Sequence, residues 1–173
     1  MSTDELNLPP SLAARPRDRR GLPIPYVQAM TEDGEPDFTA VDARKAWTAG
    51  ERRRCGLCGK RMDRWVAFIG GPSAAKQGLF LDPPMHVRCA EAALVLCPHM
   101  ATQRTQRARR HKAEDVSTPD GFVETKPEEW CLYITRQYDQ KLIPTGYLFL
   151  AAYPRKVRRY RYDEHGALKE VDE

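Results

Sequence analysis

The chain has 173 residues, of which 41% are hydrophobic and 30% charged, and this balance is ordinary for one folded domain. Its aromatic residues and apolar runs exclude a chain that is disordered throughout. No apolar stretch approaches the ~18–20 residues of a membrane helix, and the N-terminus lacks the apolar core of a signal peptide, so we expect a cytoplasmic protein without a membrane partner. The formal net charge of +4 is compatible with an acidic partner.

The first quarter of the chain predicts an arm, a hairpin and a helix. Residues 1–20 are polar, rich in proline and basic toward their end, which indicates a flexible basic arm. Residues 23–30 predict a short strand, and Asp33-Gly34 is a typical hairpin turn. Residues 42–53 predict a helix with Asp42 as its N-cap.

The middle of the chain alternates strands and helices. Residues 65–70 are apolar and rich in β-formers, so they predict a buried strand, and residues 70–78 predict a loop. Residues 79–81 predict a short strand that returns along the first. A helix follows over residues 86–96 and ends before Pro98, because proline disfavours helical backbone in the residue before it.

The last third predicts strands joined by turns. Residues 114–127 indicate a linker or surface loop, and three runs at 130–138, 146–153 and 157–162 predict an antiparallel meander. The acidic tail is expected to fray. Trp47, Trp65 and Trp130 lie within apolar patterns and are predicted core residues. The predicted organisation is an arm (1–20), a metal-binding module (21–113), antiparallel strands packed on it (114–163) and a tail (164–173).

The strongest motif is Cys55-x-x-Cys58 followed by His86-x-x-Cys89. Zinc prefers four nitrogen or sulfur ligands in a tetrahedron. Gly59 follows the first pair, where a knuckle turn often needs positive φ. His86 and Cys89 lie three residues apart at a predicted helix start and therefore share one face. The order knuckle, hairpin, helix is that of a treble clef, and the sequence predicts a structural Zn²⁺.

Other arrangements of these residues remain open. The four residues can instead be reduced cysteines and a histidine of the core. A second site can be drawn from Cys97 and His99 with His111 or Cys131. Cys97 lies ~16 Å along the helix from His86 and cannot reach the same ion.

The segments RCGLCGKRMDRWVAFIGGP and PPMHVRCAEAALVLCP, with GLPIPYVQAM before them, resemble an uncharacterised family of small zinc-binding proteins from actinobacteria and their phages. The resemblance implies a conventional zinc site and a phage or mobile-element setting, and it implies no substrate. The ligand set is also similar to the first zinc module of LIM domains. The spacing here is longer and no second module follows, so LIM partner binding is not implied.

The ligand set favours a structural metal over a catalytic one, because four protein donors leave no open position on zinc. A deaminase is excluded since neither Cys55 nor His86 is followed two residues later by glutamate. A zinc-scaffolded HNH-like nuclease remains a weak alternative, with His99 and His111 as the spare histidines and Asp82 as a nearby acid. Residues 70–78 lack the Gly-Lys-Ser/Thr ending of a phosphate loop.

Two basic segments are candidates for binding DNA or RNA, because cations release counterions from phosphates and aromatic rings stack on bases. In both segments a plain solvated face is the alternative. The candidate residues are Arg104, Arg107, Arg109, Arg110 and Lys112 in the first segment, and Arg155, Lys156 and Arg158 in the second.

Together these patterns predict an α+β protein in which a treble-clef-like zinc module packs with a small antiparallel β-sheet. We expect a non-enzymatic accessory protein that binds nucleic acid through its basic segments. The alternative is a factor that engages a host protein. No motif indicates a small-molecule substrate.

Overall fold

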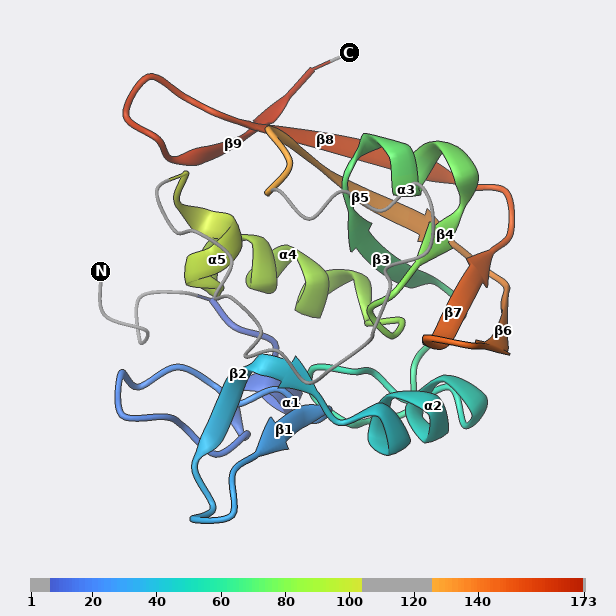
Figure 1. The fold of residues 1–173 in the computed structure, drawn as a ribbon. Helices are drawn as coiled ribbons and strands as arrows, with labels where there is room; N and C mark the ends of the chain where they lie inside the picture. The colour runs from blue at the N-terminus through green and yellow to red at the C-terminus, as the bar shows by residue number, and fades with distance from the viewer. Residues whose placement is uncertain (1–6, 104–125, 173) are drawn as a thin grey trace.

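The computed structural model describes residues 7–103 and 126–172, and over these ranges the protein is mixed α+β with three small antiparallel sheets (Figure 1). The predicted fold class is confirmed at this level. The helices are α1 (Pro10–Ala13), α2 (Ala43–Glu51), α3 (Pro72–Gln77), α4 (Val87–Leu96) and α5 (Pro98–Ala101). The strands are β1 (Gln28–Met30), β2 (Pro36–Val41), β3 (Val66–Gly70), β4 (Leu79–Phe80), β5 (Glu129–Thr135), β6 (Tyr138–Ile143), β7 (Gly146–Ala151), β8 (Lys156–Tyr162) and β9 (Leu168–Val171).

The central sheet has the order β3-β5-β8-β9, so β5, from the last third of the chain, pairs directly with β3. Strand β5 lies inside the sheet, and six of its seven residues are buried. Such burial on both faces explains why its sequence is almost continuously apolar rather than alternating. One face packs on α4, which Figure 1 shows running beneath β3, β5 and β8.

The other face of the central sheet meets the small β4-β7-β6 sheet through aromatic rings. Phe68 of β3 stacks on Phe80 of β4, with ring centroids 4.8 Å apart. Phe149 of β7 and Tyr138 of β6 close the cluster around Phe68. Offset and edge-to-face aromatic contacts of this kind add to the burial of apolar surface, and they join the two sheets into one core.

Two predicted helices form, with the N-cap of α2 and the C-terminal end of α4 as predicted, while α2 ends at Glu51 rather than at residue 53. The side chain of Asp42 accepts a hydrogen bond from the backbone N–H of Lys45 and so caps α2 as predicted. Helix α4 ends at Leu96, and Cys97 takes an extended conformation before Pro98. The predicted hairpin forms between β1 and β2, with Gly34 at φ +79° in its turn.

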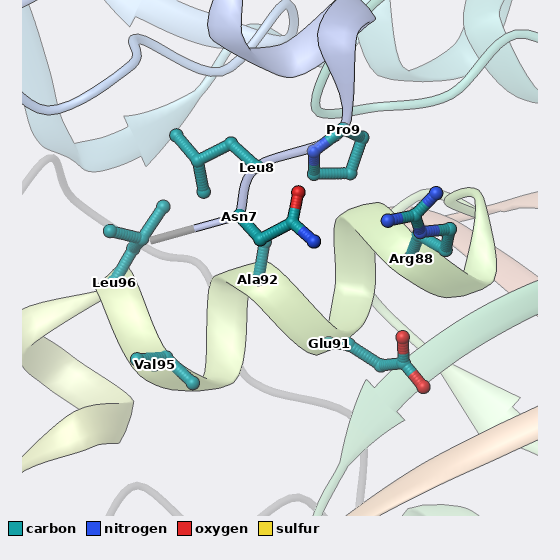
Figure 2. Close-up of a pocket in the computed structure, with 8 residues that line it drawn as sticks. All are labelled: Asn7, Leu8, Pro9, Arg88, Glu91, Ala92, Val95 and Leu96. Carbon is teal, nitrogen blue, oxygen red and sulfur yellow. The ribbon is translucent and has the colours of Figure 1, made fainter. Parts of the chain in front are cut away.

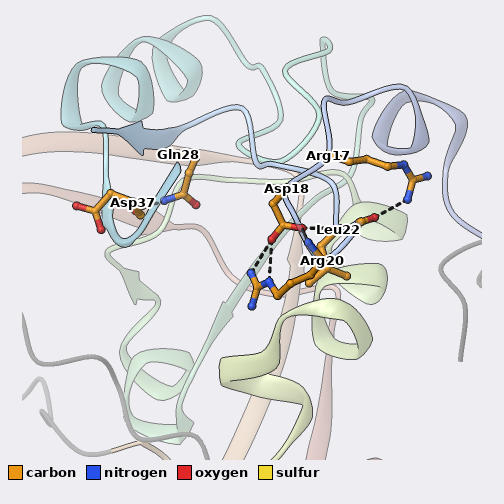
Figure 3. A network of polar contacts seen from close by, with 7 residues as sticks. Arg17, Asp18, Arg20, Leu22, Gln28 and Asp37 are labelled. Carbon is orange, nitrogen blue, oxygen red and sulfur yellow. Dashed lines mark hydrogen bonds and ion pairs between the residues drawn. The ribbon is translucent and has the colours of Figure 1, made fainter. Parts of the chain in front are cut away.

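Residues 7–20 differ from the predicted flexible arm. Leu12 of α1 is 4% exposed and belongs to the main hydrophobic cluster. The chain then turns at Asp18, whose carboxylate accepts hydrogen bonds from Arg20 and from the N–H of Leu22 (Figure 3). Burial opposes the charge of Asp18, but these donors outweigh it and lower the pKa of Asp18. An isolated apolar residue in a polar segment gave no signal of this docking.

Three further predictions are corrected by the structure. Residues 72–77 form helix α3 rather than a loop, with Pro72 in its first turn and Gly78 at φ +66° after its end. Strand β4 pairs with β7, so it does not return along β3. Residues 168–171 form β9 on the edge of β8 instead of fraying. Trp130 is buried as predicted, whereas Trp47 and Trp65 are only half-buried. Within the described ranges, no helix has the length and apolarity to span a membrane.

Candidate metal centre

The first half of the candidate centre is a tight turn between α2 and β3 that carries Cys55 and Cys58. The N–H of Cys55 donates to the carbonyl of Lys60 at 2.8 Å, and the N–H of Gly59 donates to the carbonyl of Cys55 at 2.8 Å. These bonds close the turn so that both thiols point to its inner side. We call this turn the knuckle.

Gly59 is required in the knuckle for two reasons. Its φ is +75°, which glycine adopts at little cost. A Cβ at this position would also lie 2.7 Å from Cδ2 of Tyr26. The N–H of Tyr26 in turn donates to the carbonyl of Leu57 at 2.8 Å, so the segment before β1 packs directly on the knuckle.

The second half comes from the start of α4, as the sequence predicted. His86 is the N-cap residue and Cys89 lies in the first turn. Met85 forms a two-way backbone bridge with Ala67 of β3. This bridge fixes the entry to α4 against the central sheet and brings its first turn to the knuckle.

The structure brings all four predicted ligands together. The ligand atoms of Cys55, Cys58, His86 and Cys89 lie within 4.8 Å of one another, and the three cysteines are buried. His86 Nδ1 lies 3.3 Å from the sulfur of Cys58 and 3.9 Å from that of Cys89. All five cysteines of the chain are free thiols, so no disulfide competes with a metal for them. The cluster is therefore a site that can hold a metal ion.

A backbone carbonyl that the sequence did not reveal orients the histidine. His86 Nε2 lies 3.0 Å from the carbonyl oxygen of Arg61. When Nε2 carries the proton and donates it there, Nδ1 keeps its lone pair toward the thiols, as a metal ligand requires. The N–H groups of Cys58 and His86 also donate to the sulfur of Cys55, at 3.5 and 3.4 Å. Both kinds of support come from main-chain atoms, which leave no side-chain signature.

The three thiols perturb one another strongly. Donation from Cys58, with that from Cys89, lowers the pKa of Cys55 to about 3. Hydrogen bonds to the sulfurs of Cys55 and Cys58, together with burial, raise the pKa of Cys89. Sulfurs this close cannot all ionise without a compensating charge. A divalent cation held by the cluster would supply that charge.

Among the described residues, Cys97, His99 and Cys131 do not come together as the alternative second site. Cys131 is buried next to Glu129, and burial is the main cause that raises its pKa to about 11. His99 packs edge-on against Trp130 at the far end of α4. Among the described residues only the Cys55 cluster brings three or more such ligands together, and His111 lies outside them.

The basic residues of β8 that follow Lys156 form ion pairs within the fold. Arg158 forms ion pairs with Glu91 of α4 and Glu170 of β9, and its side chain is 22% exposed. Arg159 and Arg161 both bind the carboxylate of Glu129. Arg158 therefore has acidic partners within the fold, and its contact with nucleic acid stays a prediction.

The remaining candidate contacts fall into two groups. Arg155 and Lys156 are exposed at the start of β8. The other five lie outside the described residues: Arg104, Arg107, Arg109, Arg110 and Lys112.

A shallow hollow of about 180 Å³ lies between the N-terminal segment and α4 (Figure 2). Leu8 and Pro9 line one side and Val95 and Leu96 the other. Its acid, Glu91, is already paired with Arg158. The hollow therefore offers apolar contact rather than a catalytic group.

In comparisons with known proteins, no family model, curated protein or solved structure matches the chain.

Proposed function

We propose that the Cys55, Cys58, His86 and Cys89 cluster binds a structural zinc ion and that the protein is a non-enzymatic module that binds nucleic acid. The observation that carries the zinc assignment is the closed cluster of three thiols and one oriented imidazole. Soft sulfur ligands with one imidazole suit zinc, and iron–sulfur clusters are the main alternative for such donors. Zinc is favoured because one imidazole and three thiolates around a single point match a tetrahedral ion.

The proposed role of the metal is to hold the knuckle to α4. Four protein donors complete a tetrahedral zinc shell, so no position remains for a water or a substrate. The order of knuckle, β3 and α4 supports a treble-clef-like module. The spare histidine nearest the centre in the described ranges, His99, is occupied with Trp130, which argues against the nuclease alternative.

Nucleic-acid binding is supported by charge. The net charge is +4, and the segment 103–112 holds five cations with no acid. Cations gathered in this way bind phosphates by releasing counterions. The accessory role in a phage or mobile element stays a prediction of the sequence resemblance.

Metal analysis combined with binding measurements tests both halves of the proposal. Purified protein should contain one zinc per chain and lose it to a strong chelator. Zinc-loaded protein should bind labelled DNA or RNA with an affinity that falls steeply as salt rises. Absence of zinc contradicts the metal assignment, and binding that is absent or insensitive to salt contradicts nucleic-acid binding.

A second candidate function, binding of a host protein, is supported by the β1–β2 hairpin. Its strands expose Met30 (47%), Phe38 (48%) and Val41 (38%) to solvent. Apolar residues grouped on a small sheet are typical of protein contacts. Capture of one defined protein that is lost in Phe38→Ser, with no nucleic acid retained, would favour this candidate.

A further inference from the structure

The sequence around the knuckle is a further basic segment, besides the two considered first. Residues 52–64 contain six cations and a single acid, Asp63. Among the described residues, none of the six cations forms an ion pair with a carboxylate. All six apart from Arg53 are exposed. The six are Arg52, Arg53, Arg54, Lys60, Arg61 and Arg64.

The backbone that carries these cations is held in place by the candidate metal centre. Arg54 and Arg61 face each other in an antiparallel bridge across the base of the knuckle. The N–H of Met62 donates to the carbonyl of Arg53 at 2.8 Å. The carbonyl of Arg61 meets His86 Nε2. Positive charge on both sides of the knuckle is thus fixed on one rigid turn.

Aromatic side chains continue this basic surface beyond the knuckle. Trp65 is half-buried, and the guanidinium of Arg136 lies 4.5 Å from the centroid of its ring. Arg155 approaches the same ring at 6.0 Å. The guanidinium of Arg53 donates to the carbonyl of Arg136 at 3.5 Å, which joins this group to the knuckle.

A second aromatic residue, Tyr153, is exposed beside this group. The side chain of Tyr153 is 93% exposed, although its ring is large and mostly apolar. Its carbonyl accepts a hydrogen bond from Thr135 Oγ1 at 3.2 Å, so its backbone is held against Thr135, the residue before Arg136. We define the knuckle face as the six cations together with Trp65, Arg136, Tyr153 and Arg155.

We propose that the knuckle face binds single-stranded nucleic acid. This proposal rests on the proposed function. It adds which surface of the protein binds and which form of nucleic acid is bound. Cations track the phosphates, while exposed rings and guanidinium planes stack on unpaired bases. A duplex keeps its bases inside the stack, and the knuckle face offers no helix that can enter a major groove. The rings therefore gain contacts only on a single strand.

The test uses two matched pairs of variants in the zinc-loaded full chain. Tyr153→Ala removes the exposed ring, and Leu142→Ala is its control because Leu142 is 72% exposed on the hairpin of β6 and β7. Arg64→Glu reverses a charge of the knuckle face, and Lys169→Glu makes the same change on exposed β9. The probes are a labelled oligothymidylate, the corresponding duplex and polyglutamate. Thermal melting checks that each variant stays folded.

The proposal expects tighter binding of oligothymidylate than of the duplex. Tyr153→Ala should weaken it by about 5- to 150-fold, the range for loss of one stacked base. Arg64→Glu should also lower the slope of log affinity against log salt by about 0.7. Both controls should bind as the unaltered protein does.

Three results would contradict the proposal that the knuckle face binds single-stranded nucleic acid, and none of them bears on the metal assignment. If neither Tyr153→Ala nor Arg64→Glu changes the binding of oligothymidylate, the protein binds nucleic acid as proposed but through another surface. Equal losses in the two charge variants would indicate an effect of net charge alone. Tighter binding of polyglutamate, weakened by Arg64→Glu, would assign the surface to an acidic protein. If the unaltered protein binds no nucleic acid at all, the proposed function itself fails.

Discussion

Two regions of this protein have similar cation-rich sequences, but the fold surrounds their cations differently. In β8, Arg158, Arg159 and Arg161 bind acids of α4, β5 and β9, so their charge is neutralised within the fold. Around the knuckle, the cations of residues 52–64 have no carboxylate partner among the described residues, although backbone bonds hold the turn that carries them.

The difference shows that a count of cations does not locate a binding surface. What matters is whether the fold places acids opposite the cations. Strand β8 lies between elements that supply glutamates, whereas the knuckle packs its cysteines in the core, exposes most of its cations and has one acid in its own sequence.

Loss of a metal ligand should have the largest effect, because it tests what holds the knuckle region. Cys58→Ser should destabilise the protein by more than about 4 kcal/mol, since a structural metal contributes directly to folding. Half-buried Cys97 lies outside the cluster, so Cys97→Ser is the control and should cost less than about 1 kcal/mol. Urea denaturation with zinc analysis measures both. Equal stability of the two variants would mean that the metal does not hold the knuckle.

A pair of glycine variants sharpens the test of the knuckle geometry. Gly34 and Gly59 have nearly the same φ, +79° and +75°. Alanine in this backbone region costs about 1–2 kcal/mol, which is the whole effect expected for Gly34→Ala because its Cβ meets open space. Gly59→Ala should cost about 1–3 kcal/mol more, since its Cβ overpacks the ring of Tyr26. Equal unfolding free energies for the two variants would contradict a tightly packed knuckle.

Arginine variants compare the two cation-rich regions directly. Arg158→Ala leaves Glu91 and Glu170 without their partner and should cost about 1–2 kcal/mol, between the values for exposed and buried ion pairs. Arg64→Ala should change stability by less than about 0.5 kcal/mol, as for other exposed positions. Chemical denaturation of both variants measures the difference. Equal losses of unfolding free energy in Arg64→Ala and Arg158→Ala would contradict the difference drawn between the two cation-rich regions.

The smallest expected effect is the acid response of β8. Burial raises the pKa of Glu129, but donation from Arg161 and Arg159 more than offsets it, so the pKa lies below its ordinary value of 4.5. A lowered folded pKa contributes stability that is present above pH 4.5 and is lost as the pH falls through the folded pKa. Glu129→Gln should lack this portion of the acid sensitivity in melting curves between about pH 5 and pH 2. An unchanged pH profile would contradict the neutralising role of Glu129.

The sequence by itself determined the local chemistry of the protein. The spacing of Cys55, Cys58, His86 and Cys89 was sufficient to identify the four residues of the candidate metal centre, and Asp42 and Pro98 were sufficient to fix the start of α2 and the end of α4. These features depend on residues only a few positions apart, where backbone geometry limits what can form. The mixed α+β class followed from the same local patterns.

Only the tertiary structure decided which distant segments meet. The pairing of β4 with β7 and the ion pair of Arg158 with Glu91 each join residues about 70 positions apart in sequence, and Leu12 docks in a core built from later segments. Such pairings depend on the shape of the whole core, and short apolar or charged runs fit several partners equally well. The sequence shows cations both in β8 and around the knuckle. Only the fold determines which of these cations pair with acids and which face solvent.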